Sequence, residues 1–454
     1  MADLESLGRA ELIALIVEQQ RLIEQLRKEV EELRRGGRRP AAPFSKGKPI
    51  ENPKRPGRKP GEGMFRRRNA PLQPASEVVT ASIPPDCPHC GGDLEQEHEE
   101  VVTTTELAPK PQPVVTAYRV PVCRCRKCGK PVRGTAPGLA PDQRGATAHR
   151  VGPGVMAAAH ALHYGMGIPV RKVPGVLEQL TGVRITQSAV TQDALRQAAG
   201  AAGAKYEELR AGICRAAAVH TDDTGWRVNG QSAFLMGFDT DQATVYQIRS
   251  QHRNEEVREA IPAGYAGVMV CDRGKSYDAE ELAGVAQQKC LSHLLRNISD
   301  VVKGKQGRAR QFGVTLSALL REGLALWHAR RELRLEHFVA RRLQLTERLT
   351  HHLRMRVLRD EDNRRLLDGI GLWQDRGHLL RFLETDGVEP TNNRAERILR
   401  PAVIARKVSH CSKNERGAYA FVVFLSLART ACKALGAPVA QTYRVGLLPA
   451  PAAR

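Results

Sequence analysis

Apolar positions near the start of the chain recur at the spacing of a coiled coil. β-Branched residues fall at one heptad position and leucines at the other, with Gln19 as the polar exception. The two sets are Ile16, Ile23 and Val30, and Leu12, Leu26 and Leu33. This combination favours a parallel two-stranded coiled coil. We therefore expect residues 1–36 to form a dimerisation arm, although an amphipathic helix lying on a core would show the same pattern.

Residues 37–75 lose this periodicity and alternate Pro and Gly with basic residues, as in Lys54-Arg-Pro-Gly-Arg-Lys-Pro60. A segment of this composition buries too little apolar surface to form a core of its own. It is predicted to be a flexible basic linker. Such a linker is either a plain spacer or a segment that lies along a DNA backbone.

Two Cys-x-x-Cys pairs flank short apolar runs within residues 76–132. The pairs are Cys87/Cys90 and Cys125/Cys128, with 34 residues between them. Each pair aims two thiolates at one ion, and two pairs complete the tetrahedral geometry of structural Zn²⁺. We expect a zinc ribbon with a gap longer than usual, whose strands are Val101–Thr105 and Val114–Val122. Cys123 and His89 are substitute ligands, and free cysteines are the alternative without metal.

Residues 133–205 show helical spacing. Two helical runs, Ile168–Leu180 and Ile185–Leu195, are joined by a turn that contains Gly182. This layout predicts a helix-turn-helix that binds DNA through its second helix. The first turn of that helix would offer Thr186, Gln187 and Ser188. A plain helical hairpin packed against the next domain fits the pattern equally well.

From residue 206 the apolar runs have the length of strands. Three runs separated by turns come first, and two more runs alternate with helical stretches. The predicted strands are Cys214–Thr221, Ser232–Phe238, Ala243–Ile248, Gly267–Cys271 and a run that begins at Gln288. The predicted helices are Asn254–Ile261, Tyr277–Ala283 and a helix that reaches Arg296. The order over residues 206–302 is therefore βββαβαβα, which is typical of a mixed α/β domain.

The next segment, 303–385, contains no Pro and is dense in Leu, Arg and His. Its composition predicts an all-α insertion with basic faces. Residues 386–436 are expected to return to the α/β core as its last helices, and 437–454 to form a tail.

Three carboxylates stand at distinct points in this order. Asp222 follows the first predicted strand, Asp272 follows the fourth, and Glu396 lies at the start of a helix beyond the insertion. Carboxylates at neighbouring strand ends, joined by one from a crossing helix, can hold two Mg²⁺ ions roughly 3.5–4 Å apart for phosphodiester chemistry. Taken singly, each acid is more typical of a turn or a helix cap. The order of the elements is what raises the set above chance.

Polar residues around Glu396 suit an anion. Asn392, Asn393 and Arg400 are three or four positions from Glu396 and share one helical face with it, and Arg397 adds a second guanidinium. A capped surface helix with ordinary Glu–Arg pairs is the alternative.

The charge balance points to the partner. The chain has 70 Lys plus Arg against 49 Asp plus Glu, a net charge of +21. An excess of this size favours a polyanion, most simply nucleic acid. No run of 18 apolar residues and no basic leader is present, so neither a membrane span nor secretion is indicated. Ten cysteines, half of them between 87 and 128, suggest metal binding rather than a disulfide framework.

Several segments also resemble the DDE transposases of the insertion-sequence-66 family (the TnpC type). The most specific are His220–Val228, Cys290–Arg296 and Pro390–Pro401. The resemblance extends to the N-terminal heptads, the basic linker, the first cysteine pair and residues 417–436. It implies an RNase H-like core interrupted by the insertion, which cuts DNA ends and joins them to a target.

The resemblance also implies the site. Asp222, Asp272 and Glu396 correspond to the three acids that hold Mg²⁺ or Mn²⁺, and His293 and Arg296 to the basic pair after the fifth strand. The family usually has Glu where Asp223 stands, so Asp223 remains an alternative ligand. The candidate DNA contacts are His293, Arg296, Asn392, Asn393, Arg397 and Arg400.

The sequence therefore predicts a DNA transposase of an insertion sequence. Expected partners are double-stranded DNA, a second copy or higher oligomer, and accessory transposition proteins, with no membrane. The expected location is the bacterial cytoplasm, in association with the nucleoid. The alternatives are an inactive or domesticated DNA-binding regulator, and a nuclease of the same fold that hydrolyses without joining.

Overall fold

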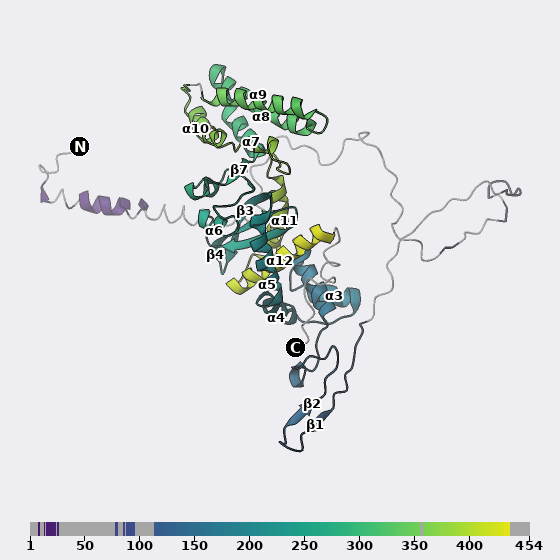
Figure 1. Ribbon diagram of the computed structural model, residues 1–454. Helices are drawn as coiled ribbons and strands as arrows, with labels where there is room; N and C mark the ends of the chain where they lie inside the picture. The colour runs from purple at the N-terminus through teal and green to yellow at the C-terminus, as the bar shows by residue number, and fades with distance from the viewer. Residues whose placement is uncertain are drawn as a thin grey trace.

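The structure, a computed structural model, describes residues 113–354 and 357–435 (Figure 1). In the N-terminal part it describes only 8–9, 13, 15–23, 25–26, 78–79, 85–86 and 88–95. Several predictions fall outside these residues. They concern the heptad positions Leu12, Val30 and Leu33, the linker 37–75, the ligand Cys87, the strand Val101–Thr105 and the tail 437–454.

A five-stranded mixed sheet forms the centre of the fold, in the order β5-β4-β3-β6-β7. The strands are β3 (Ala218–Val228), β4 (Gln231–Asp239), β5 (Thr244–Arg249), β6 (Val268–Cys271) and β7 (Ala286–Lys289). β4 is antiparallel to both β3 and β5, whereas β6 and β7 run parallel to β3. The predicted mixed α/β domain is thus confirmed.

Two predicted elements in this region were wrong. The first strand does not begin at Cys214, because Ile213–Arg215 is a 3-10 turn, and it continues through Asp222 to Val228. Pairing with β4 along its whole length keeps this polar second half extended. The helix expected at Tyr277–Ala283 is replaced by two 3-10 turns, η5 (Lys275–Tyr277) and η6 (Glu280–Leu282). Helix α6 (Asn254–Arg258) also ends earlier than expected.

Two long helices pack on this sheet, α11 (Asn393–Ser409) and α12 (Glu415–Leu435). Gly237 of β4 allows the close approach of α11: a Cβ atom there would lie 2.8 Å from Ile398 Cδ1 and 3.2 Å from Leu399 Cδ2. A side chain at this position would therefore push α11 away from β3 and β4.

The outer edge of β5 is covered by α12. Ser426 Oγ accepts a hydrogen bond from the backbone N–H of Tyr246 (2.9 Å), and Thr430 Oγ1 accepts one from Thr244 N–H (3.0 Å). Thr430 Oγ1 also donates to the Thr244 carbonyl (3.0 Å). These hydroxyls replace a neighbouring strand and satisfy backbone groups that an edge would leave open.

The opposite edge, β7, is covered by the returning end of the helical insertion. The backbone N–H of Lys289 donates to the His378 carbonyl (2.8 Å). The side chain of Gln288 donates to the Leu379 carbonyl and accepts from Phe382 N–H, both at 3.0 Å. Both edges of the five-stranded sheet are therefore closed by segments far away in the sequence.

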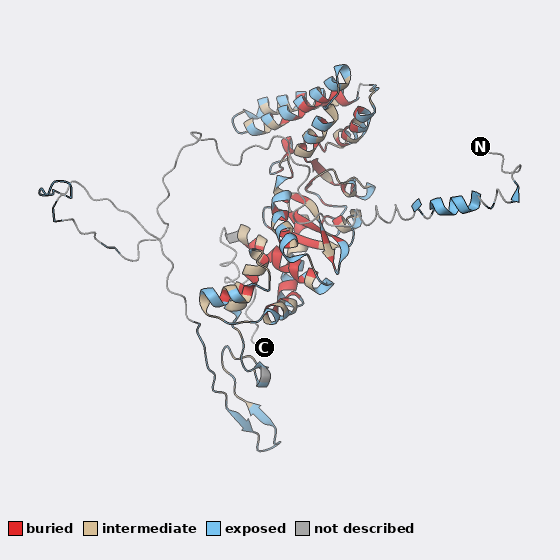
Figure 2. Cartoon of the chain, turned by 180° about the vertical axis from the view of Figure 1, so that it is seen from behind, coloured by how far each residue is buried: buried red, intermediate tan, exposed pale blue. Residues whose placement is uncertain are grey.

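The insertion is helical, as its composition indicates. Its elements are α8 (Gly307–Ala329), α9 (Leu335–Arg354), α10 (Glu361–Asp375) and the 3-10 turn η7 (Arg381–Leu383). They pack with α7 (Leu291–Val302) around an apolar core that also includes Val268 and Val270 of β6. Figure 2 shows this buried interior beside that of the sheet.

Residues 133–205 lie at the other end of the sheet from the insertion (Figure 1). They form α2 (Pro153–His160), a π-helical turn η3 (Ala161–Gly165), α3 (Val173–Thr181) and α4 (Gln187–Ala198), followed by α5 (Ala201–Gly212). Gly182, with φ of 75°, ends α3 in the left-handed conformation, as the predicted turn requires. Tyr164 stacks on Phe424 of α12 (4.8 Å), so this helical region and the sheet share one core.

The region of the second cysteine pair is a short hairpin. Strands β1 (Val122–Arg124) and β2 (Pro131–Arg133) flank the turn that carries Cys125 and Cys128. The strand predicted over Val114–Val122 is not formed, because 113–121 carries no regular structure and Val114 and Val115 are largely exposed.

Candidate active site

The strand register brings the first two acids together. β3 and β6 are parallel neighbours in which His220 pairs with Val270. Asp222 and Asp272 each lie two residues further along, so the register continues toward a side-by-side placement of their carboxylates. The sequence placed both acids beyond strand ends; the structure places Asp222 inside β3 and Asp272 directly after β6.

The third acid reaches the same place from α11. Asp222 pairs with Gly237, and paired residues project on one face of the sheet, here the face where Ile398 and Leu399 of α11 pack. Glu396 lies on the first turn of α11. The missing side chain of Gly237 thus lets the helix that carries Glu396 approach Asp222.

Asp223 pairs with a histidine on the other face of the sheet. Side chains alternate along a strand, so Asp223 projects on the opposite face from Asp222. There its Oδ1 lies 3.0 Å from Nδ1 of His252, and this carboxylate raises the pKa of His252 against the lowering effect of burial. Of the two adjacent acids, Asp222 is therefore the better placed to act with Glu396.

The charges of the neighbouring acids affect the pKa of Asp222. Burial, together with the negative charges of Asp272, Asp223 and Glu396, raises the pKa of Asp222 to about 7, although a hydrogen bond from Asp223 N–H acts in the opposite direction. A carboxyl group held among other carboxylates is stabilised when a cation joins it.

This raised pKa predicts a dependence of stability on pH. Asp222 holds its proton more tightly folded than unfolded, so its effect is absent below its ordinary pKa of 3.8, and stability is lost as pH rises toward about 7. In metal-free buffer, Asp222→Asn, which mimics the protonated carboxyl, should be more stable than wild type at pH 8 by about 2 kcal/mol. Thermal melts at pH 4 and pH 8 measure this. An equal gain at both values would contradict the assignment.

The segments Cys290–Arg296 and Pro390–Pro401 meet in space. Leu291 N–H donates to the Pro390 carbonyl (3.0 Å), and Asn392 N–H approaches Cys290 Sγ (3.2 Å). These two contacts place the first turn of α7 beside that of α11. As a result, Nε2 of His293 lies 3.6 Å from Oε1 of Glu396.

Asn392 is a correction to the predicted DNA contacts. Its side chain is fully buried and donates to the carbonyl of Thr221 (2.8 Å), the residue before Asp222. It ties the start of α11 to β3 and has no surface to offer a phosphate. The predicted common face of Asn392 with Glu396 is wrong for the same reason: Asn392 is the residue before α11 and points into the fold.

The other candidate contacts are at the surface. Asn393, Arg397 and Arg400 are exposed on the same side of α11 as Glu396, at the spacing of one helical face. Arg296 is exposed on α7, and His293 is partly exposed. Five of the six candidate contacts are therefore at least partly exposed.

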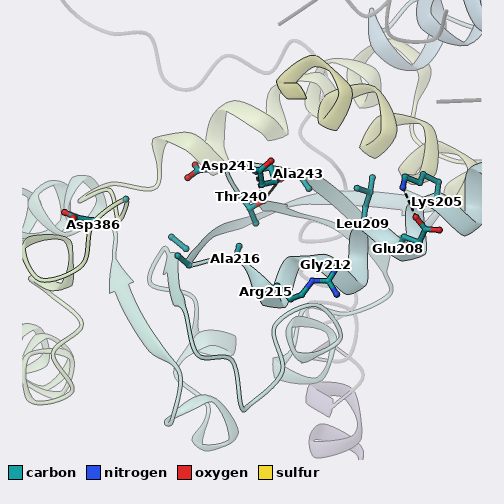
Figure 3. A pocket seen from close by; sticks show the side chains of 14 residues that line it. Lys205, Glu208, Leu209, Gly212, Arg215, Ala216, Thr240, Asp241, Ala243 and Asp386 are labelled. Carbon is teal, nitrogen blue, oxygen red and sulfur yellow. Dashed lines mark hydrogen bonds and ion pairs between the residues drawn. The ribbon is translucent and has the colours of Figure 1, made fainter. Parts of the chain in front are cut away.

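A surface hollow of about 600 Å³ lies near the N-terminal end of β3 (Figure 3). It is lined by α5, the turn after it and the β4–β5 turn, with Arg215, Asp241 and Asp386 among its charged residues. The three acids do not line it.

Comparison with known proteins agrees with this layout. Residues 149–420, well over half of the chain, match the family model described as "Transposase IS66 family". The chain belongs to this family. A relative in Sinorhizobium fredii, the uncharacterized protein y4hP, is 23% identical over 424 residues, which covers 83% of this chain and 71% of the relative.

The matched region of this IS66-family chain includes all three acids and excludes the cysteine pairs. Membership supports a transposase role and implies DNA as the partner. Among the described residues, no helix is both long and apolar enough to span a membrane.

The donor chemistry of the acids fits Mg²⁺ without forming a closed cage. Within 113–354, 357–435 and the shorter described stretches, no three His, Cys, Asp or Glu side chains lie together as a metal-binding group. Mg²⁺ keeps several waters and is commonly held by one or two carboxylates together with substrate phosphates. The carboxylates of Asp222 and Asp272 are oxygen ligands of this kind.

The described residues include three of the four predicted zinc ligands. Cys125 and Cys128 form the second knuckle, in which backbone N–H groups of Cys128 and Lys127 and the Cys128 side chain lower the pKa of Cys125. Cys90 and Cys123 are exposed, and Cys87 lies outside the described residues. A lowered thiol pKa favours the thiolate that binds metal. The zinc site stays a prediction.

Sequence reasoning missed two residues beside the acids. His252, in the loop after β5, gave no signal because an isolated histidine in a polar loop has no spacing to mark it. Lys289, at the end of β7, is fully buried, although lysine is almost never so placed without a partner. Since β7 reads Ala-Gln-Gln-Lys, no apolar pattern in the sequence marked this lysine as buried.

Proposed function

We propose that this chain is the DNA transposase of an insertion sequence, which cleaves DNA strands and transfers them by a two-metal mechanism on Asp222, Asp272 and Glu396. The observation that supports the proposal is that β3, β6 and α11 bring these acids near enough for the charges of Asp272 and Glu396 to raise the pKa of Asp222. The sheet order β5-β4-β3-β6-β7, with three antiparallel strands followed by two parallel ones, supports an RNase H-like core.

The acids and the basic residues of the site would have separate roles. Asp222 and Asp272 would hold Mg²⁺ or Mn²⁺ between them, with Glu396 as the third ligand and His293 fixing the orientation of Glu396. When bound, the metal lowers the pKa of an attacking water or 3′-hydroxyl and stabilises the leaving oxygen. Asn393, Arg397 and Arg400, one helical turn or less from Glu396, would bind the flanking phosphates and set the register of the scissile bond.

The N-terminal regions would bind and pair the element ends. In α4 the exposed residues Thr186, Gln187 and Ser188 form the first turn of the second helix of the hairpin, the position that reads DNA in a helix-turn-helix. The described heptad residues Ile16, Ile23 and Leu26 are about half exposed, which fits a face covered by a second copy. Zn²⁺ on the two cysteine pairs would fix the ribbon between these parts.

The test is strand transfer by the purified full-length chain with labelled duplex ends taken from the flanks of its own gene. We expect joined products in Mg²⁺ that disappear in EDTA and with Glu396→Gln. Cleavage without joining would favour a nuclease instead. Binding without cleavage, in the presence of Mg²⁺ or Mn²⁺, would favour a DNA-binding regulator.

A further inference from the structure

A buried lysine links the candidate active site to the helical insertion. Lys289 of β7 has no exposed surface, and its Nζ lies 2.8 Å from Oδ1 of Asp278. The ammonium also faces the rings of Tyr277 (5.8 Å) and Trp373 (5.4 Å). Burying an ion pair is a poor way to gain stability, since desolvation offsets much of the attraction. An arrangement of this kind is better explained by the geometry that it imposes.

Asp278 joins the core to the insertion. The same Oδ1 atom that meets Lys289 also accepts a hydrogen bond from Nε1 of Trp373 (3.0 Å), which lies on α10. Since Lys289 belongs to the sheet and Trp373 to the insertion, the carboxylate holds both at once. We refer to Lys289, Asp278 and Trp373 as the junction.

The junction anchors the loop that orients Asp272. Within this loop Gly274 N–H donates to Asp272 Oδ1 (2.8 Å), and Tyr277 N–H donates to the Gly274 carbonyl (3.1 Å). The Tyr277 carbonyl is held in turn by the Gln287 side chain (2.7 Å). A short chain of hydrogen bonds therefore links the carboxylate of Asp272 to Tyr277, the residue directly before Asp278 of the junction.

Trp373 touches the near end of the same loop as well. The guanidinium of Arg273, the residue next to Asp272, lies 5.4 Å from the centre of the Trp373 ring. One indole of the insertion thus contacts the loop at both ends, through Arg273 and through Asp278. A shift of α10 would therefore move the loop that carries Asp272 through two contacts, one at Arg273 and one at Asp278.

We propose that the helical insertion positions the second acid of the active site, with Lys289 and Trp373 as positioning residues that act through Asp278 on Asp272. This inference rests on the proposed function, in which Asp272 is a metal ligand. Mg²⁺ requires near-ideal octahedral geometry, so a misdirected Asp272 weakens the metal site while leaving the DNA-binding surface intact.

The test compares full-length wild type with Trp373→Phe, which keeps an aromatic ring but removes the N–H, and with Lys289→Met. Trp327→Phe is the matched control, because Trp327 is also in the insertion and also carries a stacked arginine, Arg330 at 4.1 Å, but is not in the junction. Mn²⁺ binding to the DNA-free protein is measured by electron paramagnetic resonance. Mg²⁺ dependence of cleavage, DNA affinity and thermal midpoint are measured alongside.

We expect both junction variants to weaken Mn²⁺ binding and to raise the Mg²⁺ concentration for half-maximal cleavage by about fivefold, the effect of one lost hydrogen bond. DNA affinity should stay within about twofold of wild type, and Trp327→Phe should match wild type throughout. If Trp373→Phe lowers the thermal midpoint but binds Mn²⁺ as wild type does, the inference is overturned.

The outcomes separate the two proposals. If wild type binds Mn²⁺ at a site that Asp222→Asn abolishes and the junction variants bind equally well, only the positioning role fails. If wild type has no such site, the proposed function fails and the inference fails with it. Should Lys289→Met not fold, Trp373→Phe decides alone, since it leaves the buried ion pair in place.

Discussion

Asp222→Asn is expected to abolish strand cleavage while leaving DNA binding unchanged. The substitution keeps the shape of the side chain in β3 but removes the charge that would hold the metal between Asp222 and Asp272. We expect the cleavage rate in Mg²⁺ to fall by about 10³-fold or more, at or beyond the upper range for losing one preorganised electrostatic group. Single-turnover cleavage of a labelled element end measures it, and a gel-shift titration measures the binding.

The adjacent acid provides the control. Asp223 has almost the same sequence context but projects on the other face of β3, where it pairs with His252 (3.0 Å). Asp223→Asn should therefore retain cleavage within about tenfold of wild type, because Asp223 lies beside the metal ligands without itself holding the metal. A loss at Asp223 with retained cleavage at Asp222→Asn would reverse the assignment of the ligand.

Asp239→Ala is expected to cause the largest loss of stability. Asp239, at the end of β4, is 1% exposed and meets two cations, Arg394 of α11 (2.6 Å) and Lys433 of α12. Removing the carboxylate leaves two partly buried cations facing each other. We expect a loss of about 3 kcal/mol in the free energy of unfolding, at the lower end for breaking a buried pair because both cations are partly exposed. Urea denaturation of the full-length chain measures it.

Asp241 is the matched control for this substitution. It also pairs with Arg394 (2.6 Å), but its side chain is 80% exposed. Asp241→Ala should cost less than about 1 kcal/mol, as exposed ion pairs do. Equal losses at the two positions would show that Arg394, rather than the buried carboxylate, carries the effect. Because Arg394 lies two residues before Glu396, Asp239→Ala should also slow cleavage.

The sequence predicted the sheet and the acids because both depend on local pattern. Runs of apolar residues with turn residues between them marked the first four strands of the sheet, and the acids stood at strand ends or on a helix start. The polar fifth strand, Ala286–Lys289, was predicted to begin two residues too late. Asp222 was misplaced relative to β3, since pairing with β4 extends that strand through residues that are polar on their own. Local pattern carries no information about how far a partner strand reaches.

The contacts between distant segments could not be predicted. Asn392 was predicted to contact DNA because its spacing from Glu396 placed both on one helical face. Its burial follows from the approach of α11 to Thr221, 171 residues earlier in the chain. The same is true of the junction, where Trp373 and Asp278 are 95 residues apart. Such pairs become visible only when the fold sets their elements side by side.

The closed edges of the sheet have a consequence for how the protein is made. The Thr430 hydroxyl meets Thr244 across 186 residues, and Phe382 meets Gln288 across 94. A ribosome that has released all five strands has therefore not yet released the segments that close either side. The nascent sheet stays open until the last helix emerges, and chains that end early keep an edge free to pair with other chains. Synthesis through α12 is thus needed to close the β5 edge of the sheet, and a frameshift before α12 is expected to leave that edge open.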